Sequence, residues 1–190
     1  MIDKIINEAT DAVSAAISGT GDIVGTVTTT VKDQVINVVS GTGEVATSTI
    51  EAVASVADGS VKAAGKVGTS LTETTTGIMG GAVKGVSSVG GDVMGSVFGA
   101  AQGIVKGTAD TGGDIGGAAV AAVEGAIKAA GDVGADTSEA AKSAVGGALG
   151  AATSVGGDAV GTVKEALLAS AALPRDVVES AIKGSEDKNK

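Results

Sequence analysis

An eleven-residue periodicity runs through most of the chain and limits its fold more than any other feature. Glycines followed by a charged residue stand 22 residues apart at Gly21, Gly43 and Gly65, and the spacing resumes at Gly91 after a four-residue offset. When residues 10–75 and 80–167 are written in lines of eleven, 33 of their 37 Val, Ile, Leu, Met and Phe residues fall in columns three, four, seven, eight and eleven. The charged residues collect in the opposite columns, with 22 of 24 in columns one, two, five and nine.

This period is helical. Eleven residues complete three α-helical turns at roughly 3.67 residues per turn, so each column keeps one bearing around the axis. The apolar columns then form one stripe and the charged columns the opposite one, whereas a strand requires alternation with period two. The pattern predicts an all-α protein with one or two very long amphipathic helices, possible also as a helical hairpin or bundle. A continuous helix over residues 10–167 would reach on the order of 240 Å.

Glycine content opposes a helix that stands alone. The chain has 32 Gly residues, and each costs about 1 kcal/mol relative to Ala inside a helix. Val and Thr are weak helix formers too. We therefore expect order only when the apolar stripe is buried against a surface or another helix.

The pattern divides the chain into five segments. The segment TETTTGIMGG, residues 72–81, coincides with the offset and is the candidate bend, although a helix that continues with a rotated face also fits. Pro174 ends the repeat, because proline disfavours helix in the residue before it. The predicted segments are a helix entry at 1–9, a first repeat segment at 10–75, a bend at 76–81, a second repeat segment at 82–173, and a short helix with a solvated tail at 174–190.

Two sets of residues are candidate contact sites. The first set is the apolar stripe, which suits either the core of a bundle or a face on lipid. The second is a glycine ladder of four-residue spacing, which permits close helix packing but also arises from glycine richness alone. The stripe comprises Ile23, Val24, Val27, Val31, Val38, Ile50, Val53, Val93, Met94, Val97, Phe98, Ile104, Val105, Ile127, Leu149, Val160 and Val163, and the ladder comprises Gly91, Gly95, Gly99, Gly103 and Gly107.

The charged stripe has two sides of opposite sign. Lys84, Lys106 and Lys128 share column five, whereas Asp92 and Asp114 share column two. These charges suit ion pairs between neighbouring helices, or simply a solvated face, and exposed pairs are worth only about 0–1 kcal/mol each.

Composition excludes several functions. The chain has no Cys and no His, and its formal charge is −9. Thiolate and imidazole chemistry is thus absent, and an acidic protein repels nucleic acid. We expect no catalytic, cofactor-binding or metal-binding residues. No transmembrane span and no signal peptide are predicted, because the longest uncharged runs are short and the first ten residues lack a basic and an apolar region.

The glycine-, threonine- and valine-rich repeat, seen in GDIVGTVTTTVKDQVINVVSGTGEVA, resembles the amphipathic repeats of perilipins and synucleins over about residues 10–168. The resemblance is one of pattern, without a diagnostic motif. It implies helices that fold on the surface of a lipid droplet or vesicle.

Two functions follow as hypotheses. The first is a non-enzymatic coat that adsorbs to a hydrophobic lipid or storage-granule surface, with its acidic stripe towards the cytoplasm. The second is a structural protein that assembles with copies of itself into a bundle or filament, and a homo-oligomer is expected. Ice-binding, stress-protectant and pore-forming helices complete the alternatives.

Overall fold

The computed structural model describes residues 2–18, 22–42 and 46–187, and these ranges contain nine α-helices and no strand. The helices are α1 (Ile2–Ile17), α2 (Ile23–Thr42), α3 (Ala46–Val67), α4 (Leu71–Ser88), α5 (Val93–Asp110), α6 (Ile115–Asp132), α7 (Thr137–Val155), α8 (Ala159–Ala169) and α9 (Arg175–Asp187). Their lengths lie between 11 and 22 residues. The prediction of one or two very long helices is therefore wrong, and the fold is an all-α bundle of packed helices.

A recurrent turn breaks the long helix into short ones. At the end of each of the helices α3 to α7 a glycine adopts positive φ, a conformation that costs a residue with a side chain about 1–2 kcal/mol. Two residues later an Asp or Ser begins the next helix, and Asp114 Oδ1, for example, accepts the backbone N–H of Gly117 at 3.0 Å. The glycines are Gly68, Gly90, Gly112, Gly134 and Gly156, and the N-cap residues are Ser70, Asp92, Asp114, Asp136 and Asp158. The 22-residue spacing thus measures one helix plus one turn.

The candidate bend is also corrected. Residues 72–81 lie inside α4, where Thr74, Thr75 and Ile78 are fully buried. The four-residue offset is taken up by α3 instead, which has 22 residues where α4, α5 and α6 each have 18. Four residues add about one turn to a helix, so α3 lengthens without losing its packing face.

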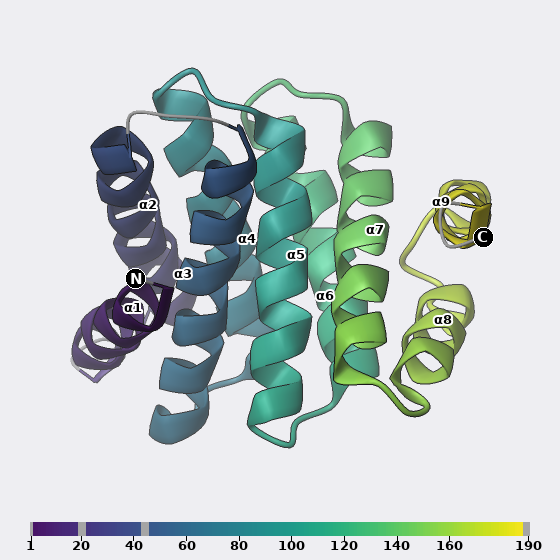
Figure 1. Cartoon of the computed structure of the whole chain (residues 1–190), viewed down its shortest axis with the longest axis horizontal. Coiled ribbons are helices and arrows are strands. Elements are labelled where there is room, and N and C mark those ends of the chain that lie inside the picture. Colours follow the sequence, from purple (N-terminus) through teal and green to yellow (C-terminus); the bar gives the residue numbers. More distant parts are fainter. Residues whose placement is uncertain (1, 19–21, 43–45, 188–190) are drawn as a thin grey trace.

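The helices form two layers. Among the helices that follow it in the chain, each of α1 to α5 packs most extensively against the second one, as α1 on α3, α3 on α5 and α5 on α7 in one layer, and α2 on α4 and α4 on α6 in the other. Figure 1 shows α3, α5 and α7 side by side, with α4 and α6 behind them. Helices within a layer run parallel. Residues further along one helix contact residues further along its neighbour.

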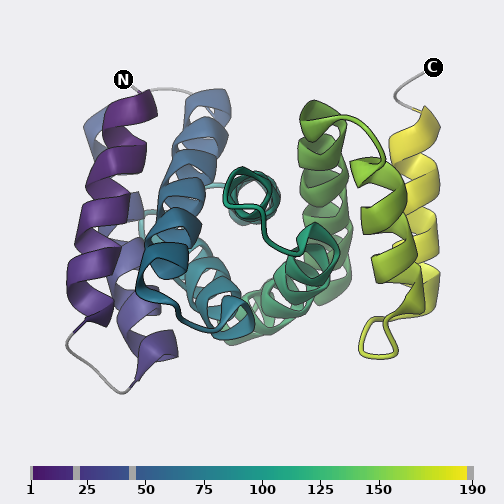
Figure 2. The ribbon, with the colours of Figure 1, turned by 90° about the horizontal axis from the view of Figure 1, so that it is seen from below.

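Contacts are confined to near neighbours in the sequence. Among the described residues, contacting helices are at most two apart in chain order. The result is a curved row of helices with the two ends of the chain at opposite ends of the row (Figure 2). Such a nearest-neighbour arrangement is that of a helical solenoid, in which each hairpin buries its apolar face against the next.

A glycine in each of the helices α3 to α7 lies close to a neighbouring helix of the same layer. We call Gly59, Gly81, Gly103, Gly125 and Gly147 the crossing glycines; they lie 22 residues apart, each against the second helix before it. A methyl group added at Gly81 would stand 2.6 Å from the Thr28 carbonyl oxygen, and at Gly103 it would strike that of Ala54. Only glycine permits this approach, which brings two helix backbones into contact.

Candidate functional site

The predicted apolar stripe is the inside of the bundle. Val27, Val31, Val53, Val97, Ile104, Val105, Leu149 and Val163 are buried, and Ile23, Val24, Val38, Ile50, Val93, Met94, Phe98, Ile127 and Val160 are partly buried. Most of the second group packs against the first in one core cluster. The stripes of successive helices therefore contact one another, and they do not form a continuous face towards solvent.

The predicted glycine ladder occupies one turn and one helix interface. Gly91 lies in the turn before α5, where its N–H donates to the Val86 carbonyl oxygen at 2.9 Å. Gly95 lies beside its N-cap residue Asp92 and Ile50 of α3. Gly99, Gly103 and Gly107 face α3, opposite Ile50, Ala54 and Asp58. Four of the five glycines thus line the side of α5 that packs on α3.

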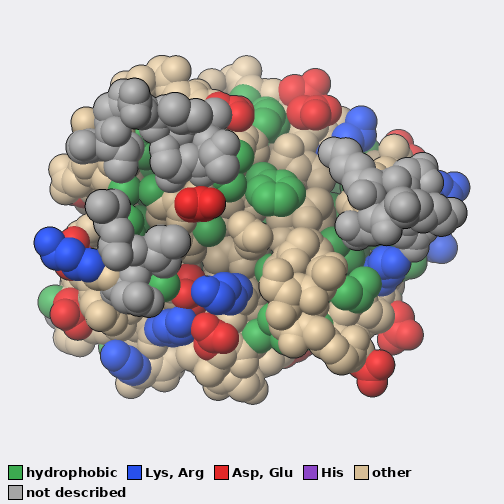
Figure 3. Space-filling model, viewed as in Figure 1, with side chains coloured by type: hydrophobic (Ala, Val, Ile, Leu, Met, Phe, Trp, Pro, Cys, Tyr) green, Lys and Arg blue, Asp and Glu red, His purple; other side chains and the backbone are tan. Residues whose placement is uncertain are grey.

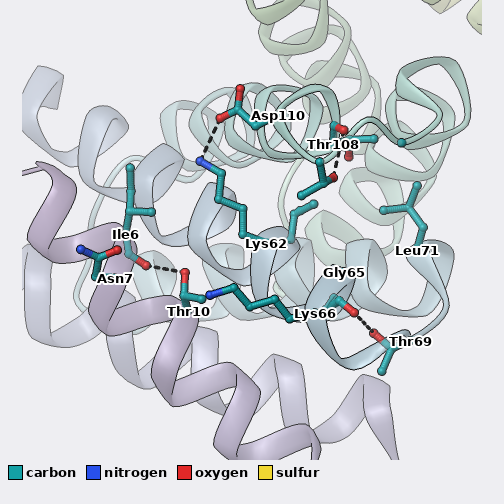
Figure 4. Close-up of a pocket in the computed structure, with 14 residues that line it drawn as sticks. Ile6, Asn7, Thr10, Lys62, Gly65, Lys66, Thr69, Leu71, Thr108 and Asp110 are labelled. Carbon is teal, nitrogen blue, oxygen red and sulfur yellow. Dashed lines mark hydrogen bonds and ion pairs between the residues drawn. The ribbon is translucent and has the colours of Figure 1, made fainter.

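A cavity with a volume of about 830 Å³ lies between α1, α3 and α5. Sequence analysis did not predict it. Its walls include Ile6, Asn7, Thr10, Val61, Lys62, Ala64, Gly65, Lys66, Thr69, Leu71, Thr108, Asp110, Thr111 and Gly113, and Figure 4 shows how they surround the space. We refer to it as the α1–α3 cavity.

The cavity has a cause in the glycine pattern. The helix α5 carries Gly99, Gly103 and Gly107 on the side that meets α3, so it lies close along its length. The equivalent positions of α3 are Ser55, Gly59 and Ala63, and Gly59 alone lies against the backbone of α1 at Ile6. The residues of α3 that line the cavity, from Val61 to Lys66, follow this crossing in the chain.

Lys62, which lines this cavity, pairs with a buried carboxylate. The Asp58 side chain is only 2% exposed, and Lys62 Nζ lies 2.9 Å from its Oδ1. The same ammonium group lies 2.8 Å from Asp110 Oδ2, so it joins α3 to α5. Lys106 adds a longer contact of 3.8 Å to Asp58. Figure 3 shows basic and acidic side chains interspersed on the part of the surface formed by these helices.

This pairing changes the proton affinity of Lys62. Partial burial acts to lower the pKa of its ammonium group, but hydrogen bonds to Asp110 and Asp58 and the attraction of both carboxylates outweigh it. The pKa of Lys62 is therefore raised above its ordinary value, and the side chain stays charged at neutral pH. A buried charge is tolerated here because oppositely charged partners lie within hydrogen-bond distance.

A similar pair occurs in the second layer. Lys84 Nζ of α4 lies 3.2 Å from Asp132 Oδ2 of α6, and both side chains are more than 40% exposed. Some charges of the predicted charged stripe thus pair across neighbouring helices of a layer. Asp92, Asp114 and Asp136 instead accept backbone N–H groups at helix starts.

The described residues contain no group of three or more acidic side chains placed to hold a metal ion. None of the helices in the described ranges is both long and apolar enough to cross a bilayer. No protein-family model matches the chain, and no curated protein matches it significantly in sequence. The stripe and the α1–α3 cavity are therefore the two features from which a function is argued.

Proposed function

We propose that the protein is a non-enzymatic coat protein that rests as a closed stack of helices and opens on a hydrophobic surface. The surface is that of a lipid droplet or storage granule in the cytoplasm, and the protein stays at its periphery. Opening exchanges one partner of the stripe for another: Val97 and Val163 leave their neighbouring helices and contact the surface. The same apolar area is buried in both states, so the free-energy difference between them is small compared with the cost of exposing the stripe to water.

The nearest-neighbour packing of the stack supports this proposal most directly. Because contacting helices are at most two apart in chain order, the stack can open hairpin by hairpin from either end through to its middle. Local opening of this kind is the common low-energy route in layered helical proteins. The formal charge of −9 then faces water and keeps coated particles apart.

The alternative of a filament has weaker support from the ends of the stack. The first helix exposes Lys4, Glu8 and Asp11, and the last exposes Arg175 and Asp176. Charged outer faces on terminal helices are typical of capping elements, which stop a stack from growing. We therefore place self-assembly second.

Distance measurement between two spin labels tests the opening. Labels at positions 84 and 132, attached to Cys in a chain that has none of its own, report on the contact between α4 and α6. We expect a short distance in water and a much longer one after binding to a triolein emulsion. Labels at positions 124 and 128 of α6 are the control, and their distance stays constant because the helix persists. Adsorption with an unchanged distance between 84 and 132, or no adsorption, contradicts the proposal.

A further inference from the structure

We propose that the α1–α3 cavity binds a monoanionic amphiphile, a carboxylate with an aliphatic chain of medium length. The site is formed in the closed stack, so its existence does not rest on the proposed coat function. Its volume of about 830 Å³ lies within the range of sites for small organic ligands.

The polar groups of the cavity favour a ligand that accepts hydrogen bonds. The hydroxyl protons of its threonines are already used: Thr10 donates to the Ile6 and Gly59 carbonyl oxygens, and Thr111 to those of Gly107 and Thr108. In the described part of the chain, Lys66 and Asn7 have no hydrogen-bond or ion-pair partner, so their N–H donors are available. A carboxylate matches these donors, because it only accepts hydrogen bonds.

The position of Lys66 adds the charge preference. Its aliphatic stem runs across the cavity towards Thr10 of α1 (Figure 4). The charge of Lys62 is neutralised by Asp58 and Asp110, which leaves the ammonium of Lys66 as the uncompensated cation. Asp110 also lines the cavity and repels a second negative charge. The site therefore favours a monoanion over a dianion such as phosphate.

The walls supply the apolar part of the site. Ile6 of α1, Val61 of α3 and Leu71 of α4 line the cavity, and Val61 is only 2% exposed. An aliphatic chain that enters this space removes apolar area of its own and of the walls from water. A carboxylate held by Lys66 at the rim leaves its chain directed towards these residues.

Titration of octanoate into the full-length protein, followed by calorimetry and by amide chemical shifts, tests the site. Octylamine and octan-1-ol are the charge controls. We expect octanoate to bind with shifts confined to α1, α3, the start of α4 and the end of α5 with the turn after it, and both control ligands to bind at least tenfold more weakly. Equal affinities for octanoate and octylamine, or no binding of octanoate, overturn the proposal.

Two variants locate the site, and a third is the matched control. Lys66→Gln removes the charge and should weaken octanoate binding at least tenfold. Gly65→Leu fills the cavity: a β-carbon at Gly65 has no closer neighbour than Thr111 Cγ2 at 3.7 Å, so the helix accepts the larger side chain. Lys142→Gln on α7, far from the cavity in sequence, should bind like the parent. An unchanged affinity in Gly65→Leu with an unaltered melting temperature places the ligand elsewhere and contradicts the assignment.

Discussion

The crossing glycines determine how closely the helices of one layer pack. Four of them lie against the backbone of the second helix before them, as Gly103 does at Ala54 and Gly147 at Phe98, whereas Gly125 lies against the Met79 side chain. The absence of a side chain lets backbone atoms come into contact, which compensates for a core built largely of Ala and Val. The cost that glycine imposes on helix formation is thus offset at these positions by packing that no larger residue permits.

Gly103→Ala should destabilise the protein, although alanine is the better helix former. The added methyl group strikes the Ala54 carbonyl oxygen, and overpacking of this kind costs about 1–3 kcal/mol. Gly161→Ala in α8 is the matched control, because nothing lies within 4 Å of its β-carbon position, and it should stabilise by about 0.5–1 kcal/mol. Urea denaturation measures both free energies of unfolding; two changes of the same sign would contradict the role of the crossing glycine.

The ion pairs of the two layers should contribute differently to the free energy of unfolding. Lys62→Met leaves the buried carboxylate of Asp58 without its closest partner and should cost about 3 kcal/mol. Lys84→Met breaks an exposed pair with Asp132 and should cost at most about 1 kcal/mol. Denaturation of both variants at pH 7 measures this difference, and equal losses would show that the burial of Asp58 has no consequence.

The Lys62 pair also sets a pH dependence. Because the pKa of Lys62 is raised in the folded state, its stabilisation is complete below the ordinary lysine pKa and is lost as the pH rises through the folded-state value. We expect the stability difference between the parent and Lys62→Met to be constant from pH 7 to about pH 10 and to shrink at more alkaline pH. A difference that grows above pH 10 is the opposite of this expectation.

The ends of the helices are the part of the fold that the eleven-residue pattern does not predict. The helical period and the apolar face were visible in the sequence, because a helix of five turns shows the same columns as a longer one. The helix ends are not visible in the pattern, because the turn residues keep the eleven-residue frame. Asp92 and Asp114, which begin new helices, therefore stay in the charged column. One signal was available: Val89, Val133 and Val155 fall outside the apolar columns, and they mark helix ends, where Val89 and Val155 are more than 40% exposed.

The candidate cavity was not predictable in the same way. It lies between helices that are distant in the sequence, and no local pattern encodes how these helices pack together. The sequence shows Ser55 and Ala63 in α3 at the positions where α5 has glycines. The effect of this difference on the distance between helices can be predicted only when it is known which helices pack together.

The N-cap aspartates should contribute to stability in proportion to their hydrogen bonds. Asp114 accepts the Gly117 N–H, and its replacement by Ala should cost about 1 kcal/mol. Asp158 begins α8 without a capping hydrogen bond from its side chain, so Asp158→Ala should cost less and serves as the control. Urea denaturation of the two variants compares the losses, and a larger effect at Asp158 would contradict this assignment of the caps.

At the scale of the whole molecule, the repeating unit is a hairpin of 44 residues, since two helices with their turns restore the same layer. Lys62 and Lys106, 44 residues apart, accordingly occupy equivalent positions in α3 and α5, and Gly59, Gly103 and Gly147 are crossing glycines of one layer. A stack of this kind gains and loses stability by whole units. A single continuous helix with an eleven-residue period, in contrast, has no such unit. It would tolerate any insertion or deletion that keeps the following residues in the same columns.

Deletions of different length distinguish these two architectures. Removal of residues 93–136 joins Asp92 to Thr137, so α7 follows α4 with an N-cap residue in place and reaches the face of α3 that α5 occupied. We expect this shortened protein to keep its helix content per residue and a cooperative thermal transition, as measured by circular dichroism. Removal of residues 93–103 preserves the eleven-residue columns but cuts α5 to less than half its length, and it should abolish the cooperative transition. If the shorter deletion is tolerated as well as the longer one, the stacked hairpin is the wrong unit, because both deletions remove a multiple of eleven residues and a continuous helix of that period tolerates either.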